Sequence, residues 1–161
     1  MNTAGPPPGY SPAEVADRLA ITDLLHTYAW AIDAQDWALL DTVFTPDAQL
    51  DYSSNPGGVA GPYPEVRAWL ESVMQYFPIT QHLMSNSIVT LDGDRATAKT
   101  MVHNPQGART RTAHPHMFFV GARYDDQLVR TDAGWRIAQR VETLLWMHGG
   151  LPAELIPPED D

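Results

Sequence analysis

The chain has 161 residues, with 20 acidic side chains against 10 basic ones and a formal net charge of −10. This length predicts one domain with its own core, and the acidic balance argues against nucleic acid or an anionic membrane surface as the main partner. The absence of cysteine from the sequence excludes disulfides, thiolate nucleophiles and cysteine-ligated metals. No apolar run approaches the roughly 20 residues of a membrane span. The N-terminus lacks a signal-peptide pattern, so we expect a cytoplasmic protein.

The first predicted element is a long helix. Ser11 is placed as its N-cap, Pro12 fits the first helical position, and Glu14 completes a capping box. Apolar residues then recur at helical spacing as far as about Ala34. We therefore expect one amphipathic helix whose apolar side faces a core.

The pattern beyond this helix is mixed. Asp36 can cap a short helix over 37–44, and a further helix is predicted over 64–77. Between these helices lie a short strand over 48–52 and a loop over 53–64, whose proline and glycine content permits a lid. The rest of the chain predicts four strands joined by hairpins, over 80–91, 95–103, 117–130 and 135–146.

Helices that precede an antiparallel meander indicate an α+β fold rather than a doubly wound α/β fold. The early helices would cover one face of a curved antiparallel sheet, and such a cone usually has an internal pocket. We expect this domain to cover 11–151. A flexible leader over 1–10 would precede it, and an acidic, proline-rich tail over 152–161 would follow.

Two residues are the main candidates for catalysis. Asp33 continues the buried side of the first helix, because it lies four residues after Ala29 and eight after Leu25. A buried carboxylate is unfavourable unless it is paired, so Asp33 either faces a cavity or bonds a nearby loop. His82 near the start of a strand is by itself typical of a satisfied core residue. A neighbouring carboxylate would fix its tautomer and raise its basicity, as in a catalytic triad.

Several motifs resemble the SnoaL-like group of the NTF2-like superfamily, and together they span Glu14 to Trp146. The motifs are Tyr28 to Trp37 (YAWAIDAQDW) with Leu40, Phe44, Asp47 and Ala48 after it, Gly61-Pro62 before a helix, Thr80-Gln81-His82 with Asn86 beyond, and Gly134 to Ile137 (GWRI). This resemblance implies a cone-shaped α+β barrel with an internal pocket.

Within that group the sequence is similar to scytalone dehydratase, bile-acid 7α-dehydratase and hexachlorocyclohexane dehydrochlorinase. The resemblance implies a lyase without metal or organic cofactor, in which Asp33 and His82 form the general base. It also implies that Tyr28 and Tyr52 orient or protonate a substrate oxygen. The reaction would be proton abstraction beside a carbonyl, followed by loss of a leaving group or a double-bond shift. We expect an apolar, oxygenated substrate (polyketide-, steroid- or terpenoid-like) and a homodimer or homotrimer.

The remaining pocket candidates are less constrained. The resemblance implies a second pocket histidine on the next strand, for which His103 is the nearest candidate, although Thr100 or Met101 could fill that place. By strand alternation Arg140 shares a face with Glu142, and it either pairs with that residue or binds an anionic substrate group. The full set of expected substrate-binding residues is Met84, Asn86, Met101, His103, Phe119, Arg140, Leu144 and Trp146.

Other functions fit the same fold, because fold alone does not decide function. They are an isomerase, a polyketide cyclase, an epoxide hydrolase, and a non-catalytic binding or assembly module in which Asp33 and His82 form only a structural bond. His114 and His116 together with His103 could in principle bind a metal. Their spacing matches no known metal motif, so we expect no metal site.

Overall fold

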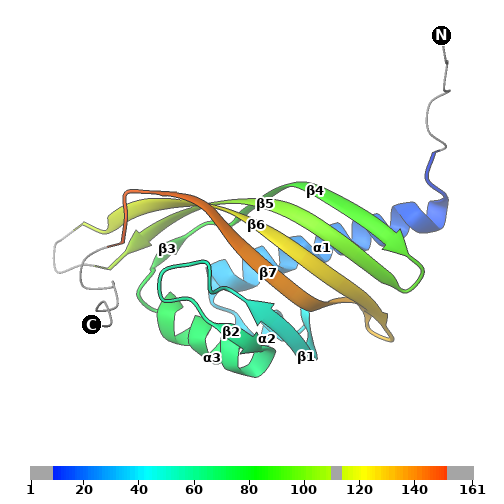
Figure 1. Cartoon of the computed structure of the whole chain (residues 1–161), viewed down its shortest axis with the longest axis horizontal. Coiled ribbons are helices and arrows are strands. Elements are labelled where there is room, and N and C mark those ends of the chain that lie inside the picture. Colours follow the sequence, from blue (N-terminus) through cyan, green and yellow to red (C-terminus); the bar gives the residue numbers. More distant parts are fainter. Residues whose placement is uncertain (1–8, 110–113, 152–161) are drawn as a thin grey trace, which may run out of the picture.

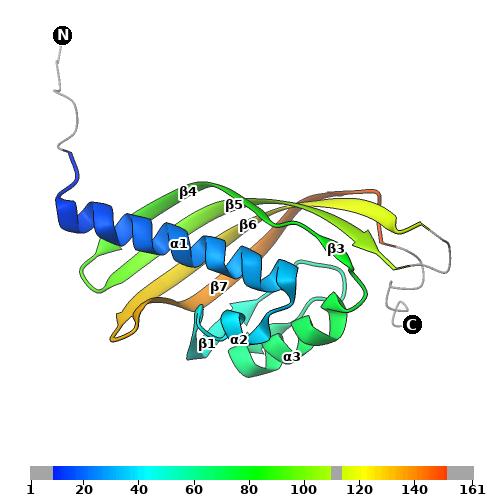
Figure 2. The same ribbon diagram turned by 180° about the vertical axis from the view of Figure 1, so that it is seen from behind.

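The computed structural model describes residues 9–109 and 114–151. A long helix lies along one face of a curved sheet (Figures 1 and 2). Two shorter helices lie beside the strands, near the C-terminal end of the long helix. The elements are α1 (Pro12–Ala34), α2 (Trp37–Leu40), β1 (Phe44–Asp51), β2 (Ala60–Pro62), α3 (Tyr63–Met74), β3 (Ile79–Thr80), β4 (Leu83–Asp92), β5 (Arg95–Ala108), β6 (His116–Thr131) and β7 (Gly134–His148). The predicted α+β class is confirmed, with a sheet that curves but does not close.

Helix α1 begins as its sequence predicts. The Ser11 hydroxyl accepts a hydrogen bond from the Glu14 backbone, and the Glu14 carboxylate accepts one from the Ser11 backbone. These two bonds satisfy amide groups that the first helical turn leaves without partners. The helix ends at Gln35, which adopts a left-handed conformation with φ of 53°. The cap and the apolar spacing therefore set both the length of α1 and its buried side.

The seven strands follow the order β2-β1-β7-β6-β5-β3, and β4 also pairs with β5. Strands β4 to β7 form the predicted antiparallel meander, with tight turns at Asp92–Arg95 and Thr131–Gly134. The parallel pairing of β1 with β7 was not predicted. It joins strands that are far apart in the sequence, and the local pattern of neither strand identifies the other as its partner.

Several predicted boundaries differ from the structure, and the strand expected over 48–52 already begins at Phe44. The short helix over 37–44 stops at Leu40, because the chain turns there and Phe44 already begins β1. The loop over 53–64 contains the short strand β2, which pairs with β1. The helix over 64–77 ends at Met74.

The strand expected over 80–91 is interrupted at Gln81 and His82. The His82 backbone N–H donates a hydrogen bond to the Asp33 carboxylate instead of to a neighbouring strand. The interruption therefore results from a contact with α1.

The concave face of the sheet carries the core. Along β5 the buried side chains include Thr100, Val102 and Asn104, whereas Met101 and His103 between them are exposed. This period of two is the expected alternation of a strand with one buried face. The helices pack against the buried side and close the core.

Parts of the expected organisation cannot be compared with the structure. Residues 1–8 of the predicted leader and the predicted tail over 152–161 lie outside the described residues. None of the described helices is both long and apolar enough to cross a membrane.

Candidate active site

A cavity of about 510 Å³ lies between the concave face of the sheet, the C-terminal half of α1 and helix α3. Aromatic and aliphatic side chains form most of its wall, and the loop over 53–64 contributes Asn55, Pro56 and Gly57. Its polar groups include Tyr28, Tyr52, Tyr124, His82, Asn104 and Glu142. An apolar cavity of this size with a few polar groups is typical of a small-molecule site.

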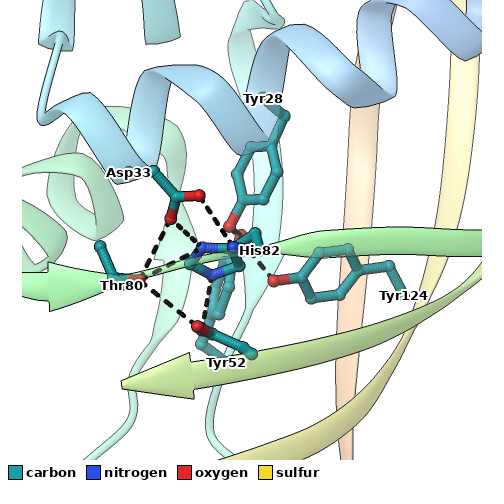
Figure 3. Close-up of polar contacts among 7 residues, drawn as sticks. Tyr28, Asp33, Tyr52, Thr80, His82 and Tyr124 are labelled. Atoms are coloured by element: carbon teal, nitrogen blue, oxygen red, sulfur yellow. Dashed lines mark hydrogen bonds and ion pairs between the residues drawn. The ribbon is translucent and has the colours of Figure 1, made fainter. Parts of the chain in front are cut away.

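The structure brings Asp33 and His82 together at this cavity (Figure 3). His82 Nδ1 lies 2.6 Å from Asp33 Oδ1, and the His82 backbone N–H donates to Asp33 Oδ2 at 2.8 Å. The Thr80 hydroxyl donates to the same Oδ1 atom at 3.1 Å. The carboxylate thus holds both the backbone and the ring of His82.

The charge on Asp33 depends on these contacts. Asp33 lies in the last turn of α1, where the helix dipole disfavours a carboxylate. Burial also raises the pKa of Asp33, but the hydrogen bonds and charge of His82 outweigh it and hold that pKa below the ordinary value. Asp33 is therefore ionised near neutral pH, and Nδ1 of His82 carries the proton that faces it. The remaining nitrogen of neutral His82, Nε2, has a free lone pair in this tautomer.

The side-chain amide of Asn104 contacts that lone pair. This amide lies 2.9 Å from His82 Nε2, and the Thr80 hydroxyl lies 3.3 Å from its oxygen. Since Nε2 accepts in this tautomer, the Asn104 NH₂ group is the donor. Asn104 therefore contacts the imidazole in place of His103, which was the expected neighbour. The two residues are adjacent on β5, and strand alternation turns Asn104 inward and His103 outward.

Three buried tyrosines lie beside the imidazole. The Tyr28 hydroxyl is 3.0 Å from that of Tyr52 and 3.4 Å from that of Tyr124. Burial raises the pKa of all three phenols, and raises those of Tyr52 and Tyr124 well above the ordinary value. They are therefore neutral hydrogen-bond donors over the whole physiological range. The resemblance implied Tyr28 and Tyr52, whereas Tyr124 was not predicted.

A buried ion pair supports this tyrosine cluster. The guanidinium of Arg140 forms two hydrogen bonds with Asp126, at 2.7 and 2.8 Å, and both side chains are fully buried. Its central carbon lies 4.1 Å from the ring centres of both Tyr28 and Tyr124. Alternation places Arg140 correctly on the face of Glu142, but both interpretations of its role are wrong. Its partner is Asp126 rather than Glu142. Its guanidinium lies against the rings of Tyr28 and Tyr124 and does not line the cavity, so it is not exposed to an anionic ligand there.

Four predicted pocket residues lie on the outer face of the sheet. Met101, His103, Phe119 and Trp146 are all exposed, and the His103 ring stacks on Phe119. The alternation that was expected to carry Trp146 inward fails at Leu145. There a β-bulge adds one residue to β7, so that Trp146 pairs with Gly121 while Leu144 pairs with Ala122. One extra residue reverses the face of every side chain that follows it.

The other predicted pocket residues also lie outside the large cavity. Asn86 is exposed and has a φ of 51° within a bulge of β4, a conformation that asparagine tolerates well. Met84 lines a smaller hollow on another side of His82, and Leu144 packs against the core.

Sequence reasoning gave no role to Thr80 or Tyr124, did not consider Asn104, and treated Glu142 only as a partner for Arg140. Tyr124 and Glu142 are in-facing residues of long strands, so alternation could have placed them. Their proximity to His82 depends on how the sheet curves. In the ranges 9–109 and 114–151, no three His, Cys, Asp or Glu side chains gather where a metal ion could be held.

Comparison with known proteins shows the family. The SnoaL-like domain family matches residues 13–141. The uncharacterized protein Rv2910c of Mycobacterium tuberculosis is 44% identical over 136 residues, which cover 83% of this chain and 88% of that protein.

Solved structures show the same fold. A scytalone dehydratase-like protein of Novosphingobium aromaticivorans is 17% identical to this chain, with a TM-score of 0.75. The match covers 92% of this chain and 97% of that protein. The hexachlorocyclohexane dehydrochlorinase LinA-type3 of Novosphingobium barchaimii is 18% identical to this chain, with a TM-score of 0.72. The match covers 90% of this chain and 97% of that protein. The match over most of the domain, together with the helix-covered curved sheet, shows that this chain belongs to the SnoaL-like family.

Proposed function

We propose that this protein is a cofactor-independent lyase of the dehydratase type, which acts on an apolar, oxygenated small molecule. The observation that carries the proposal is an ionised carboxylate bound to a histidine that opens into a cavity beside three neutral tyrosines. The fold shared with a dehydrochlorinase, which is named for an elimination reaction, supports the same class of chemistry.

His82 is the general base in this proposal. Nε2 takes a proton from the carbon next to a substrate carbonyl, and Asp33 stabilises the imidazolium that forms. In this proposal the hydroxyls of Tyr28, Tyr52 and Tyr124 donate hydrogen bonds to the oxygen that gains negative charge. General-base catalysis contributes about 10²–10⁴-fold, and the enclosed cavity adds orientation and exclusion of water.

Asn104 has to move before His82 can act. Its amide holds the lone pair that would receive the substrate proton. When a substrate oxygen enters, the amide group can donate to that oxygen instead, so that Nε2 is released as the ligand is bound. In the protein without a ligand, the Asn104 amide thereby keeps the His82 ring in one orientation until a substrate fills the cavity.

The substrate class follows from the wall of the cavity. Trp69, Phe77 and Phe118 provide large apolar surfaces. A volume of about 510 Å³ lies within the roughly 300–1,000 Å³ of small-molecule sites. A ring system of the polyketide, steroid or terpenoid kind with a carbonyl beside the acidic carbon fits these walls.

The test uses His82→Ala, with His103→Ala on the outer face as the matched control. Wild type and both variants are incubated with β-hydroxy ketones of increasing ring number, starting from the aldol adduct of benzaldehyde and acetone, and enone formation is followed by ultraviolet absorption. His82→Ala should lower kcat/KM by about 10²–10⁴-fold, and His103→Ala should leave it unchanged. Equal activity in wild type and His82→Ala would contradict the proposal.

A second candidate function is a non-catalytic small-molecule-binding module. It is favoured by one contact, the Asn104 amide on His82, because both ring nitrogens are then satisfied within the protein. For a binding module, wild type would bind the ketones without turnover. Asn104→Ala would then change ligand affinity or stability and would produce no reaction.

A further inference from the structure

One acidic side chain in the cavity has no part in the general base. Glu142 lies in the middle of β7, is only 8% exposed and lines the same cavity as His82. It pairs across the sheet with Tyr124, so the two side chains are neighbours on the concave face. A carboxyl group is thus held at the wall of an apolar cavity, beside the tyrosine cluster.

The charges around Glu142 leave it without a dedicated cation. Arg140 lies two residues away on the same face, but its Nε and Nη2 atoms are bound to Asp126. Among the described residues that line the cavity there is no lysine or arginine. Burial raises the pKa of Glu142, and a hydrogen bond from Asn55 and the charges of His82 and Arg140 oppose that rise without cancelling it. The carboxyl group therefore keeps its proton to a higher pH than an exposed glutamate does.

We propose that Glu142 is the general acid of this site and delivers a proton to the oxygen that leaves the substrate. This inference rests on the proposed lyase function and completes it, because hydroxide is a poor leaving group and a hydroxyl group departs faster as water when an acid donates a proton to it. A neutral carboxylic acid in an apolar site is well suited to this role.

The step balances within the site. His82 Nε2 takes the proton from the carbon beside the carbonyl, and the electrons of that C–H bond form the new C=C bond. The C–O bond breaks, and its oxygen takes the proton of Glu142 and leaves as water. The proton on His82 then returns to the Glu142 carboxylate through a water molecule in the emptied cavity.

This arrangement also selects the ligand. An anionic substrate would enter a cavity whose described lining has no unpaired cation and a buried carboxyl group, so charge disfavours it. We therefore expect an uncharged β-hydroxy carbonyl compound, whose hydroxyl group lies towards Glu142 and whose acidic carbon lies towards His82.

The first part of the test needs no ligand. The side-chain carboxyls of glutamate are labelled with ¹³C, and the resonance of Glu142 is identified by its absence in Glu142→Gln. We expect its titration midpoint to lie clearly above the value of about 4.3 for an exposed glutamate. A midpoint at or below that value would overturn the inference, whatever becomes of the lyase proposal.

The second part compares two leaving groups on one substrate skeleton. The probes are the aldol adduct of benzaldehyde and acetone, whose hydroxyl group needs a proton to leave as water, and its para-nitrophenyl ether, which loses a stable phenolate without one. Glu142→Gln should lower kcat/KM by about 10²–10⁴-fold for the hydroxy ketone and by only a few-fold for the ether. His82→Ala should lower both, and Glu65→Gln on the exposed side of α3 should change neither.

The outcomes separate the two proposals. If His82→Ala lowers turnover but Glu142→Gln slows both probes equally, Glu142 is structural and the inference fails alone. If wild type eliminates neither leaving group, the lyase proposal fails, and the role of Glu142 as its acid fails with it. Unchanged thermal unfolding of Glu142→Gln shows that the variant is folded.

Discussion

Replacing Asp33 with asparagine tests the contact on which the site depends. The side chain keeps its size but loses its charge. Its oxygen can still accept from one donor, yet an NH₂ group now occupies the place of the second oxygen. The ring of His82 or its backbone N–H, at 2.6 and 2.8 Å from the carboxylate, is then left facing a second donor.

The expected cost can be worked from these bonds. A hydrogen bond to a charged group contributes about 1.5–3 kcal/mol to stability, and a buried donor without a partner costs about 1–3 kcal/mol. The Asp33 side chain is 20% exposed, so water recovers part of this loss. We therefore expect Asp33→Asn to lower the free energy of unfolding by about 2–3 kcal/mol near pH 7, which leaves a typical domain folded.

The cost should depend on pH. The pKa of Asp33 is lowered in the folded protein, so its stabilisation is fully present above the unfolded value of about 3.9 and is lost as the pH falls through the folded value. Wild type and Asp33→Asn should therefore differ in stability near neutral pH and converge in strong acid.

Two measurements check this prediction. Urea unfolding is followed near pH 7 and near pH 3, with Asp23→Asn on the exposed side of the same helix as control. In ¹⁵N NMR spectra, the ring of His82 should show the Nδ1–H tautomer in wild type and a mixture of both neutral tautomers in Asp33→Asn, because the contact between Nδ1 and Asp33 Oδ1 fixes the tautomer. If Asp33→Asn unfolds like Asp23→Asn and the ring of His82 keeps the same single tautomer, the argument from these contacts is refuted.

Two further substitutions test the supports of the cavity. Asp126→Asn leaves the fully buried guanidinium of Arg140 without its counter-charge, and we expect a loss of about 3–5 kcal/mol in urea unfolding; a loss below about 1 kcal/mol would show that the pair is not needed. Gly58→Ala should lower stability by about 1–3 kcal/mol in thermal unfolding, because the new Cβ would lie 2.0 Å from the Tyr52 carbonyl oxygen. In the control Gly61→Ala the nearest atom is 3.4 Å away, and equal melting of the two variants would contradict this reasoning.

Local sequence patterns were sufficient to predict helix α1, the hairpins and the class of the fold. The capping box at Ser11 and Glu14 and the apolar spacing that reaches Asp33 act over a few residues, so they can be read without knowledge of the partner. The contact between Asp33 and His82 was expected from a family resemblance rather than from spacing. The structure supplies the distances that spacing could not.

The strand faces were harder to predict because each depends on counting single residues. His103 was the expected neighbour of His82, but Asn104 makes the contact. Trp146 was expected to line the cavity, but the bulge at Leu145 turns it outward. A strand has a side-chain period of two, so one bulge or one residue of register moves a side chain to the opposite face.

What the sequence determined by itself is the set of elements whose signals are local: a capped amphipathic helix, tight turns and alternating strands. What only the tertiary structure decided is which charges are paired and which are available. Arg140 lies within Coulombic reach of Asp126 and Glu142, and the register of β6 against β7 places Asp126 directly opposite Arg140, so that the guanidinium binds Asp126. Glu142 is left facing the cavity, and its burial depends on helices α1 and α3, which form the opposite walls and are distant from Glu142 in sequence.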